Sequence, residues 1–397
     1  MKWILFAVGV VFSGIILISG CDNDLDGFRK NELTLSFATF NARLGDELPL
    51  REHREEKATS LLKGIDADIV CIQEVYEQDV INDILGVMKK ESGHFSFLYK
   101  MTDNEDFDPI PPLCTENDIA PIMMCIISNC MSEGMDPACI ITNCWAEFLS
   151  LPADCRNCML AEGFGSITEG GDITSIFTSC MTPQKIEYKY SGKNGVLLAS
   201  RYPMKDKGYL LLTSFGKLRS AFYATVNRPG IGDVQVICTG LSTPIEDMEY
   251  DGPVSGWQDE QLLQAQEILD IPVKENVAQR VIMGDFNGNI SAGSNMIERN
   301  SGAVSLILNN GWYDPYFDVH RDDYIQCSVC PENPLVDDKE SGYVPDHIFF
   351  RERKGFSFLT KRILLNEFVL TDEKAQTKTK FSVSDHYGIS TTMTIDK

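Results

Sequence analysis

Apolar residues occur along this chain in short alternating or continuous runs that predict β-strands. Residues 33–41 alternate apolar and polar positions and predict a strand that ends at Asn41. Residues 68–74 form an almost continuous apolar run that ends at Glu74, and residues 281–283 form another that leads into Gly284 and Asp285. Similar patterns predict further strands at 95–99, 195–200, 220–226, 234–239, 343–350, 363–370 and 389–395.

Helical periodicity separates several of these strands. Residues 52–63, 77–90, 257–269 and 294–309 are the expected helices. Ser255–Gln258 resembles a capping box, and Leu262, Ala265 and Leu269 fall on one face of the helix that would follow. Because strands outnumber helices and helices are interspersed among them, we expect two stacked sheets with helices on the outside.

The cysteines predict a disulfide framework in the middle of the chain. Eight of the 13 cysteines fall between residues 101 and 190, and the segment 125–130 recurs fourteen residues later as 139–144. Cysteines five apart on a helix diverge by about 140°, so cross-links between two facing copies are expected rather than links within one copy. We interpret residues 101–189 as a disulfide-stapled helical insert between two parts of one domain, 33–100 and 190–397.

The remaining cysteines leave two questions open. Cys71 and Cys238 lie inside apolar strand-like runs, where buried free thiols are the expectation. Cys327 and Cys330 form a close pair. Together with Cys155 and Cys158 that pair offers zinc as a competing interpretation, although no histidine lies near either pair.

The N-terminus predicts export. Lys2 precedes an uncharged run from Trp3 to Gly20, and small residues lead into Cys21. Residues 1–21 therefore resemble a bacterial lipoprotein signal, in which Cys21 is lipidated and attaches the protein to a membrane. An ordinary secretory signal and, less favoured, a retained membrane anchor are the alternatives.

The net charge of −23 argues against a broad basic surface that would wrap nucleic acid. A small phosphate site stays compatible with this charge, because a bound cation reverses the local sign.

Polar side chains stand at the ends of several predicted strands. Each alone is compatible with an ordinary turn, as Asp285 and Asn287 would be in an Asx-rich loop. Together they provide oxygen ligands for a hard cation such as Mg²⁺, and one histidine beside carboxylates for proton transfer. The residues concerned are Asn41, Glu74, Asp285 with Asn287, Asp346, and Asp385 with His386.

These motifs, in this order, resemble those of the endonuclease/exonuclease/phosphatase superfamily. The resemblance covers roughly residues 33–100 and 190–397, and it rests on Phe40-Asn41, Ile72-Gln-Glu74, Gly284-Asp-Phe-Asn287, Asp346-His-Ile-Phe349 and Ser384-Asp-His386. It implies an α+β fold, a four-layer αββα sandwich of two mainly antiparallel sheets flanked by helices. It also implies metal-dependent hydrolysis of phosphoesters.

The resemblance further implies a role for each motif residue. His386 would be the general base, and Asp346 would orient it. Asp285 and Asn287 would position the attacking water and the phosphate. The metal, Mg²⁺ or alternatively Mn²⁺ or Ca²⁺, would be bound by residues among Glu74, Asn41, Asp285, Asn287 and Asp385. His347, next to Asp346 on a strand, should point away and be structural.

One position departs from the pattern of secreted members. They carry Thr-His-Leu on the strand before the long helix, whereas this chain has Thr239-Gly240-Leu241. Gly240 therefore stands where a second histidine, a phosphate contact and proton donor, is expected. Loss of such a donor costs about 10²–10³-fold in rate. Arg219 and Tyr223 are residues that could approach the phosphate instead.

In layout the chain is most similar to bacterial and neutral sphingomyelinases. This similarity implies a phospholipid headgroup as substrate, and we expect a monomer. A secreted nuclease that acts on DNA is the first alternative. A catalytically impaired member that acts as a surface binding protein is the second. The apolar residues of the insert, such as Ile126, Ile127 and Trp145, could contact a membrane or form the small core of the stapled hairpin.

Overall fold

The computed structural model describes most of the chain beyond residue 32. The described residues are 33–45, 48–100, 110–131, 137–162, 173–183, 188–245, 249–289, 301–320, 326–336, 342–365, 367–372 and 377–396. The expected signal with Cys21, and residues 294–300 of one expected helix, lie outside them. The chain divides into the units Met1–Leu33 and Thr34–Lys397, and the second unit is described below. No helix within the described residues is long and apolar enough to cross a membrane.

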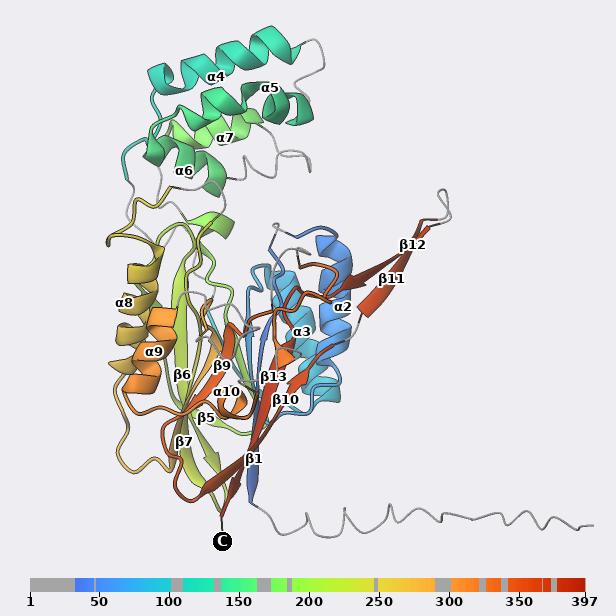
Figure 1. Cartoon of the computed structure of the whole chain (residues 1–397), viewed down its shortest axis with the longest axis vertical. Coiled ribbons are helices and arrows are strands. Elements are labelled where there is room, and N and C mark those ends of the chain that lie inside the picture. Colours follow the sequence, from blue (N-terminus) through green and yellow to red (C-terminus); the bar gives the residue numbers. More distant parts are fainter. Residues whose placement is uncertain are drawn as a thin grey trace, which may run out of the picture. The chain divides into compact units, whose positions relative to one another are not determined.

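Two sheets stacked face to face form the centre of the fold (Figure 1). The first has the strand order β10 (Phe356–Ile363), β13 (Gly388–Ile395), β1 (Thr34–Asn41), β2 (Ile69–Gln73), β4 (Leu197–Ser200) and β3 (Ser96–Tyr99). The second has the order β5 (Met204–Leu212), β6 (Arg219–Arg228), β7 (Gly232–Gly240), β8 (Gln279–Asp285) and β9 (Asp346–Phe350). A separate hairpin pairs β11 (Glu367–Asp372) with β12 (Thr377–Ser382).

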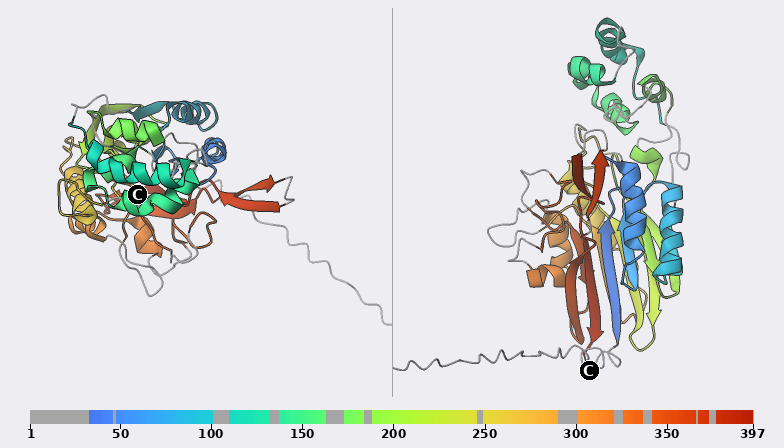
Figure 2. Two further views of the ribbon diagram at one scale, coloured as in Figure 1. Left: turned by 90° about the horizontal axis from the view of Figure 1, so that it is seen from above. Right: turned by 90° about the vertical axis from the view of Figure 1, so that its right-hand side faces the viewer.

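Helices cover the outer face of each sheet (Figures 1 and 2). α2 (Arg51–Leu62) and α3 (Gln78–Glu91) pack on the first sheet, where Leu62 and Ile84 join one apolar core with Phe40. α8 (Trp257–Leu269) and α9 (Ser301–Asn309) pack on the second sheet. A short helix, α10 (Pro315–His320), and a 3₁₀ turn, η5 (Lys189–Gly192), complete this part. The four-layer αββα sandwich and the α+β class are therefore confirmed.

The inner faces of the two sheets meet in a buried layer. Side chains alternate along each strand, so Phe37 of β1 and Phe350 of β9 both point inward, with ring centroids 5.4 Å apart. In the same layer a disulfide joins Cys71 of β2 to Cys238 of β7 and links the two sheets covalently. The expectation of free thiols at these positions was wrong, because each cysteine faces inward at the same level of the sandwich.

The segment between β3 and β4 contains α4 (Glu116–Asn129), α5 (Pro137–Leu149), α6 (Ala153–Ala161) and α7 (Ile173–Cys180). These helices share an apolar core of their own. The expected cross-links between the repeated segments are confirmed, since Cys125 bonds Cys144 and Cys130 bonds Cys139. The remaining disulfides here are Cys114–Cys155 and Cys158–Cys180. Whether residues 101–189 form a separate subdomain stays a prediction.

Zinc binding by the two close cysteine pairs was wrong. Cys155 and Cys158 bond different partners, and Cys327 bonds Cys330 directly, so none of these sulfurs is a thiolate ligand.

Three local predictions were also wrong. The residue before α8 is Gly256, with no side-chain cap, so the expected capping box is absent. Of the predicted apolar face of α8, Ala265 and Leu269 pack against the core of the second sheet together with Ile268, whereas Leu262 is 40% exposed. The strand expected at 363–370 is split between β10 and β11, and Leu364 between them has a left-handed φ of 58°.

Candidate active site

The polar strand ends meet at one end of the two stacked sheets. In the first sheet Asn41 pairs in register with Gln73, the residue before Glu74. In the second sheet Asp285 pairs with Gly240 on one side and with Asp346 on the other. Asn41 Nδ2 donates to Asp285 Oδ2 at 2.7 Å, which joins the two sheets at this point. The sequence motifs, far apart in the chain, therefore converge.

The backbone at this end has features that direct the site side chains. A Cβ on Gly284 would lie 1.9 Å from the carbonyl oxygen of Thr239, so only glycine allows this close approach of β8 to β7. Glu74 and Asn287 have left-handed φ values of 58° and 48°. Such conformations are costly for residues with side chains and cluster at functional sites.

Asp285 is buried and held in one orientation. Its Oδ2 accepts from Asn41, and its Oδ1 accepts from the backbone N–H of Asn287 at 2.8 Å. Burial raises the pKa of this carboxyl to about 6, against the lowering effect of the charge on His386. The side chain of Asn287 donates to the carbonyl of Leu241 at 2.8 Å, which ties the loop after β8 to the end of β7.

His386 and Asp346 form a buried pair. Nδ1 of His386 lies 2.8 Å from Oδ2 of Asp346, so Nδ1 carries the hydrogen and Nε2 is left to accept a proton. Burial lowers the pKa of His386, but the carboxylates of Asp346 and Asp385 outweigh it and raise the pKa to about 10. The predicted base and its predicted orienting carboxylate are thus brought together.

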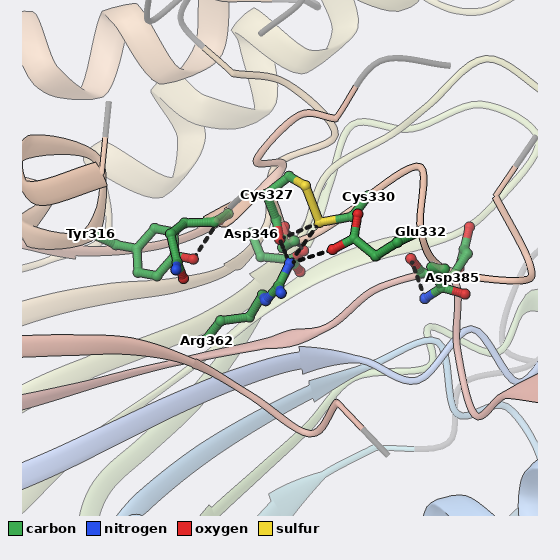
Figure 3. The surroundings of a disulfide bond; sticks show 10 residues. Tyr316, Cys327, Cys330, Glu332, Asp346, Arg362 and Asp385 are labelled. Carbon is green, nitrogen blue, oxygen red and sulfur yellow. Dashed lines mark hydrogen bonds and ion pairs between the residues drawn. A yellow bond between two sulfur atoms is a disulfide. The ribbon is translucent and has the colours of Figure 1, made fainter. Parts of the chain in front are cut away.

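A loop closed by the Cys327–Cys330 disulfide supports this pair (Figure 3). Ser328, between the cysteines, donates from Oγ to Asp346 Oδ2 at 2.7 Å, and its carbonyl accepts from the N–H of Tyr387 at 2.7 Å. Arg362 of β10 donates to the carbonyl of Cys327 at 3.1 Å. Sequence reasoning missed Ser328, because no motif marks it. The only signal was the short spacing of the two cysteines around it.

Glu74 is buried among positively charged side chains. Arg219 Nη1 lies 3.5 Å and Lys217 Nζ 3.9 Å from its Oε1. Arg43 Nε lies 3.6 Å from its Oε2. Arg43 also binds Asp385, with Nη1 2.9 Å from Oδ2.

Asp385 therefore faces Arg43, outside the compact group that Asp285, Asp346 and His386 form. Burial would raise the pKa of Asp385, but the charges of Arg43 and His386 lower it below its ordinary value. Ser384 Oγ donates to the carbonyl of Asn41 at 2.8 Å and accepts from the N–H of His386 at 3.0 Å. The segment 384–386 is thus attached directly to the end of β1.

His347 points away from this group, as predicted. Its Nδ1 lies 2.6 Å from Asp314 Oδ2, and its Nε2 lies 3.0 Å from the carbonyl of Gly288. Both neighbours accept hydrogen bonds, so the ring binds them best as an imidazolium. Burial lowers the pKa of His347, but the bond to Asp314 raises it above its ordinary value. We interpret His347 as a support of the 285–289 loop.

The residues present fit a hard divalent cation. Potential ligand atoms of Asp285, Asp346 and His386 lie within 4.8 Å of one another. Oδ1 of Asp346 is buried and has no hydrogen-bond partner among the described residues. Carboxylate oxygens are the ligands that Mg²⁺ prefers. Of the five predicted metal ligands, Asp285 belongs to this group, and Asn41 and the backbone of Asn287 contact it. Glu74 and Asp385 lie outside the group, beside cationic side chains.

Comparisons with known proteins give a family and a fold. The model of the Endonuclease/Exonuclease/phosphatase family matches residues 38–386. No curated protein sequence matches the chain.

Among solved structures, SmcL is 12% identical with a TM-score of 0.52, covering 91% of this chain and 99% of its own. An endonuclease/exonuclease/phosphatase from Beutenbergia cavernae DSM 12333 is 17% identical, with a TM-score of 0.47; the match covers 91% of this chain and 72% of that chain. Sphingomyelinase C from Streptomyces griseocarneus is 12% identical, with a TM-score of 0.48; the match covers 91% of this chain and 99% of that chain. At such identities the similarity to SmcL concerns the fold alone.

Proposed function

Because this chain belongs to the endonuclease/exonuclease/phosphatase family, whose members are typically phosphoesterases, we propose that it is a Mg²⁺-dependent phosphodiesterase. The observation that carries the proposal is the buried His386–Asp346 pair, which lies beside Asp285 where the strand ends converge. This arrangement combines a base, a carboxylate that orients it, and oxygen ligands for a cation.

In the proposed reaction, bound Mg²⁺ would lower the raised pKa of His386, and Nε2 of the neutral ring accepts a proton from the attacking water. Asp346 holds the ring in the required tautomer and stabilises the imidazolium that forms. Asp285 and Asn287 orient the water and the phosphate. The new bond joins the water oxygen to phosphorus, the ester bond to the leaving alcohol breaks, and the alkoxide takes a proton from solvent. Mg²⁺, held by residues among Asn41, Glu74 and Asp285, would offset charge on the phosphoryl oxygens.

A phospholipid headgroup is the favoured substrate. The net charge of −23 disfavours a polyanion such as DNA. The segment that contains α4–α7 adds apolar surface, since Met124, Ile127 and Met131 are each at least half exposed. It also forms a partly open apolar pocket of about 190 Å³ lined by Ile119, Met123, Ile126, Ile173, Phe177 and Met181. These features support a substrate that presents hydrocarbon as well as phosphate.

The disulfides indicate an exported protein. Attachment to a membrane through lipidated Cys21, and a monomeric state, are further parts of the proposal.

The purified protein should be assayed with Mg²⁺ against sphingomyelin vesicles, phosphatidylcholine vesicles, plasmid DNA and bis(4-nitrophenyl) phosphate. We expect hydrolysis of a phospholipid and of the small diester, and its loss in His386→Ala. His53→Ala, at an exposed histidine of α2, is the matched control and should keep full activity. Activity on DNA alone would refute the lipid substrate. A complete lack of hydrolysis, together with no Mg²⁺ binding, would favour a binding protein.

A further inference from the structure

Arg219, at the start of β6, has a buried guanidinium whose N–H donors are only partly satisfied by its protein neighbours. The residue is 3% exposed, and among the described residues its Nε and Nη2 have no hydrogen-bond partner. Nη1 has one, at the long distance of 3.5 Å from Glu74. Burying a charged donor group without a hydrogen-bond partner destabilises the folded protein. An oxygen-rich ligand would satisfy these donors.

The position of Arg219 places it beside Gly240. A Cβ built on Gly240 would lie 3.8 Å from Nη1 of Arg219 and 3.5 Å from Cγ of Gln73. Gly240 is also the register partner of Asp285. The guanidinium therefore borders the place where the resemblance led us to expect a histidine that contacts phosphate.

The backbone does not require glycine at position 240. Its φ lies outside the left-handed region, and a Cβ there would make ordinary van der Waals contacts. By contrast, a Cβ on Gly284 would collide with Thr239. A side chain is thus sterically acceptable at 240, and the absence of one leaves the guanidinium of Arg219 adjacent to the site.

Charged side chains of both signs lie close to Arg219. Lys217 and Arg219 both face Glu74 Oε1, while Arg43 is shared between Glu74 and Asp385. Three cationic side chains are therefore gathered on this side of the site, where the carboxylates of Glu74, Asp385 and Asp285 balance their charge, although the whole protein is strongly acidic. Guanidinium groups bind phosphate through paired N–H donors.

We propose that Arg219 binds a non-bridging oxygen of the substrate phosphate and so provides the phosphate contact that Gly240 cannot make. The proposal rests on the phosphodiesterase function given above. An arginine stays protonated, so it stabilises negative charge but does not give a proton to the leaving alcohol. The enzyme should therefore depend strongly on the acidity of that alcohol, with nitrophenyl esters hydrolysed much faster than alkyl esters.

The first test measures binding of inorganic phosphate by calorimetry, in EDTA and again in Mg²⁺. Arg219→Gln should weaken binding at least tenfold, and Arg219→Lys, which keeps the charge, should have a smaller effect. Arg228→Gln, at the other end of β6, is the matched control and should bind like the parent protein. Circular dichroism of each variant verifies the fold, and Arg219→Lys serves if Arg219→Gln does not fold. Unchanged phosphate binding in the Arg219 variants, or no binding by the parent, would overturn the proposal.

The second test measures kcat against diesters with a series of leaving alcohols. Arg219→Gln should lower kcat about 10²-fold for every substrate, because it removes a contact to an oxygen that all share. Gly240→His in that background should restore rate mainly for poor leaving groups, since histidine also donates a proton. Gly240→Ala is the steric control. An unchanged kcat in Arg219→Gln would contradict the inference while leaving the phosphodiesterase function intact. If the parent protein hydrolyses none of the diesters, the phosphodiesterase function is refuted. The phosphate-binding measurements would then still test whether Arg219 binds phosphate.

Discussion

Removal of the disulfide between the two sheets should destabilise the protein more than removal of any short-range cross-link. Cys71 and Cys238 are 167 residues apart, and the disulfides within α4–α7 shorten this loop to roughly 100 residues, which corresponds to about 5 kcal/mol of loop-closure free energy. The double substitution Cys71→Ala, Cys238→Ala should lower the free energy of unfolding by that order. For a chain of this size the loss corresponds to a fall in Tm of roughly 6 °C.

Urea denaturation and calorimetry of the double variant measure this loss directly. The matched control is Cys125→Ala, Cys144→Ala, which opens a 19-residue loop that Cys130–Cys139 shortens further. The same relation gives about 3 kcal/mol for this pair. Equal losses in the two variants, or a loss below about 1 kcal/mol for Cys71 and Cys238, would refute the account based on chain entropy.

Three further predictions concern the site. Ser328→Ala removes the hydrogen bond to Asp346 and should lower kcat roughly tenfold, with the limb of the pH–rate profile that reports His386 moved upward. In metal-free protein His386 should titrate near pH 10 by NMR, and Mg²⁺ should lower that pKa. Because the pKa of His386 is raised in the folded protein, protonated His386 stabilises the fold fully below pH 6.5, and this stabilisation is lost as pH rises through 10. The free energy of unfolding of His386→Gln should therefore depend less on pH than that of the parent protein. Asp314→Asn leaves the buried His347 without its charged partner and should lower the free energy of unfolding by about 3–5 kcal/mol in urea titrations, and an unchanged midpoint would contradict that role.

The fold was predictable because its strands carry clear patterns and its motifs lie at strand ends. Asn41, Asp285 and Asp346 could be assigned to one site from the sequence alone, since each follows or begins a buried apolar run. The cross-links between α4 and α5 could be predicted as well, because the repeat fixes which cysteines face each other.

The wrong or missing predictions concern contacts between segments that are far apart in the chain, because the pattern within one segment does not show which other segment it contacts. Cys71 and Cys238 each lie in an apolar run, and nothing local to either run indicates that the two strands stack at the same level. Ser328 acts through a loop rather than a periodic element, so its bond to Asp346 had no signature. Arg219 could be named as a candidate, but its burial and its unpaired donors required the three-dimensional structure.

The connection between β3 and β4 has a consequence for how this family member could be altered. These strands are adjacent and antiparallel, with Tyr99 opposite Leu197, and Asn194 Nδ2 donates to the carbonyl of Lys100 at 2.8 Å. The chain therefore leaves and re-enters the sheet at neighbouring points, as it would in a simple hairpin. We predict that a short turn in place of α4–α7 leaves the strands that carry Asn41, Asp285 and Asp346 in register, and that it uncovers Phe215 and Trp257, which pack against these helices. Changes in α4–α7 could then alter what the protein binds without altering the site at the strand ends.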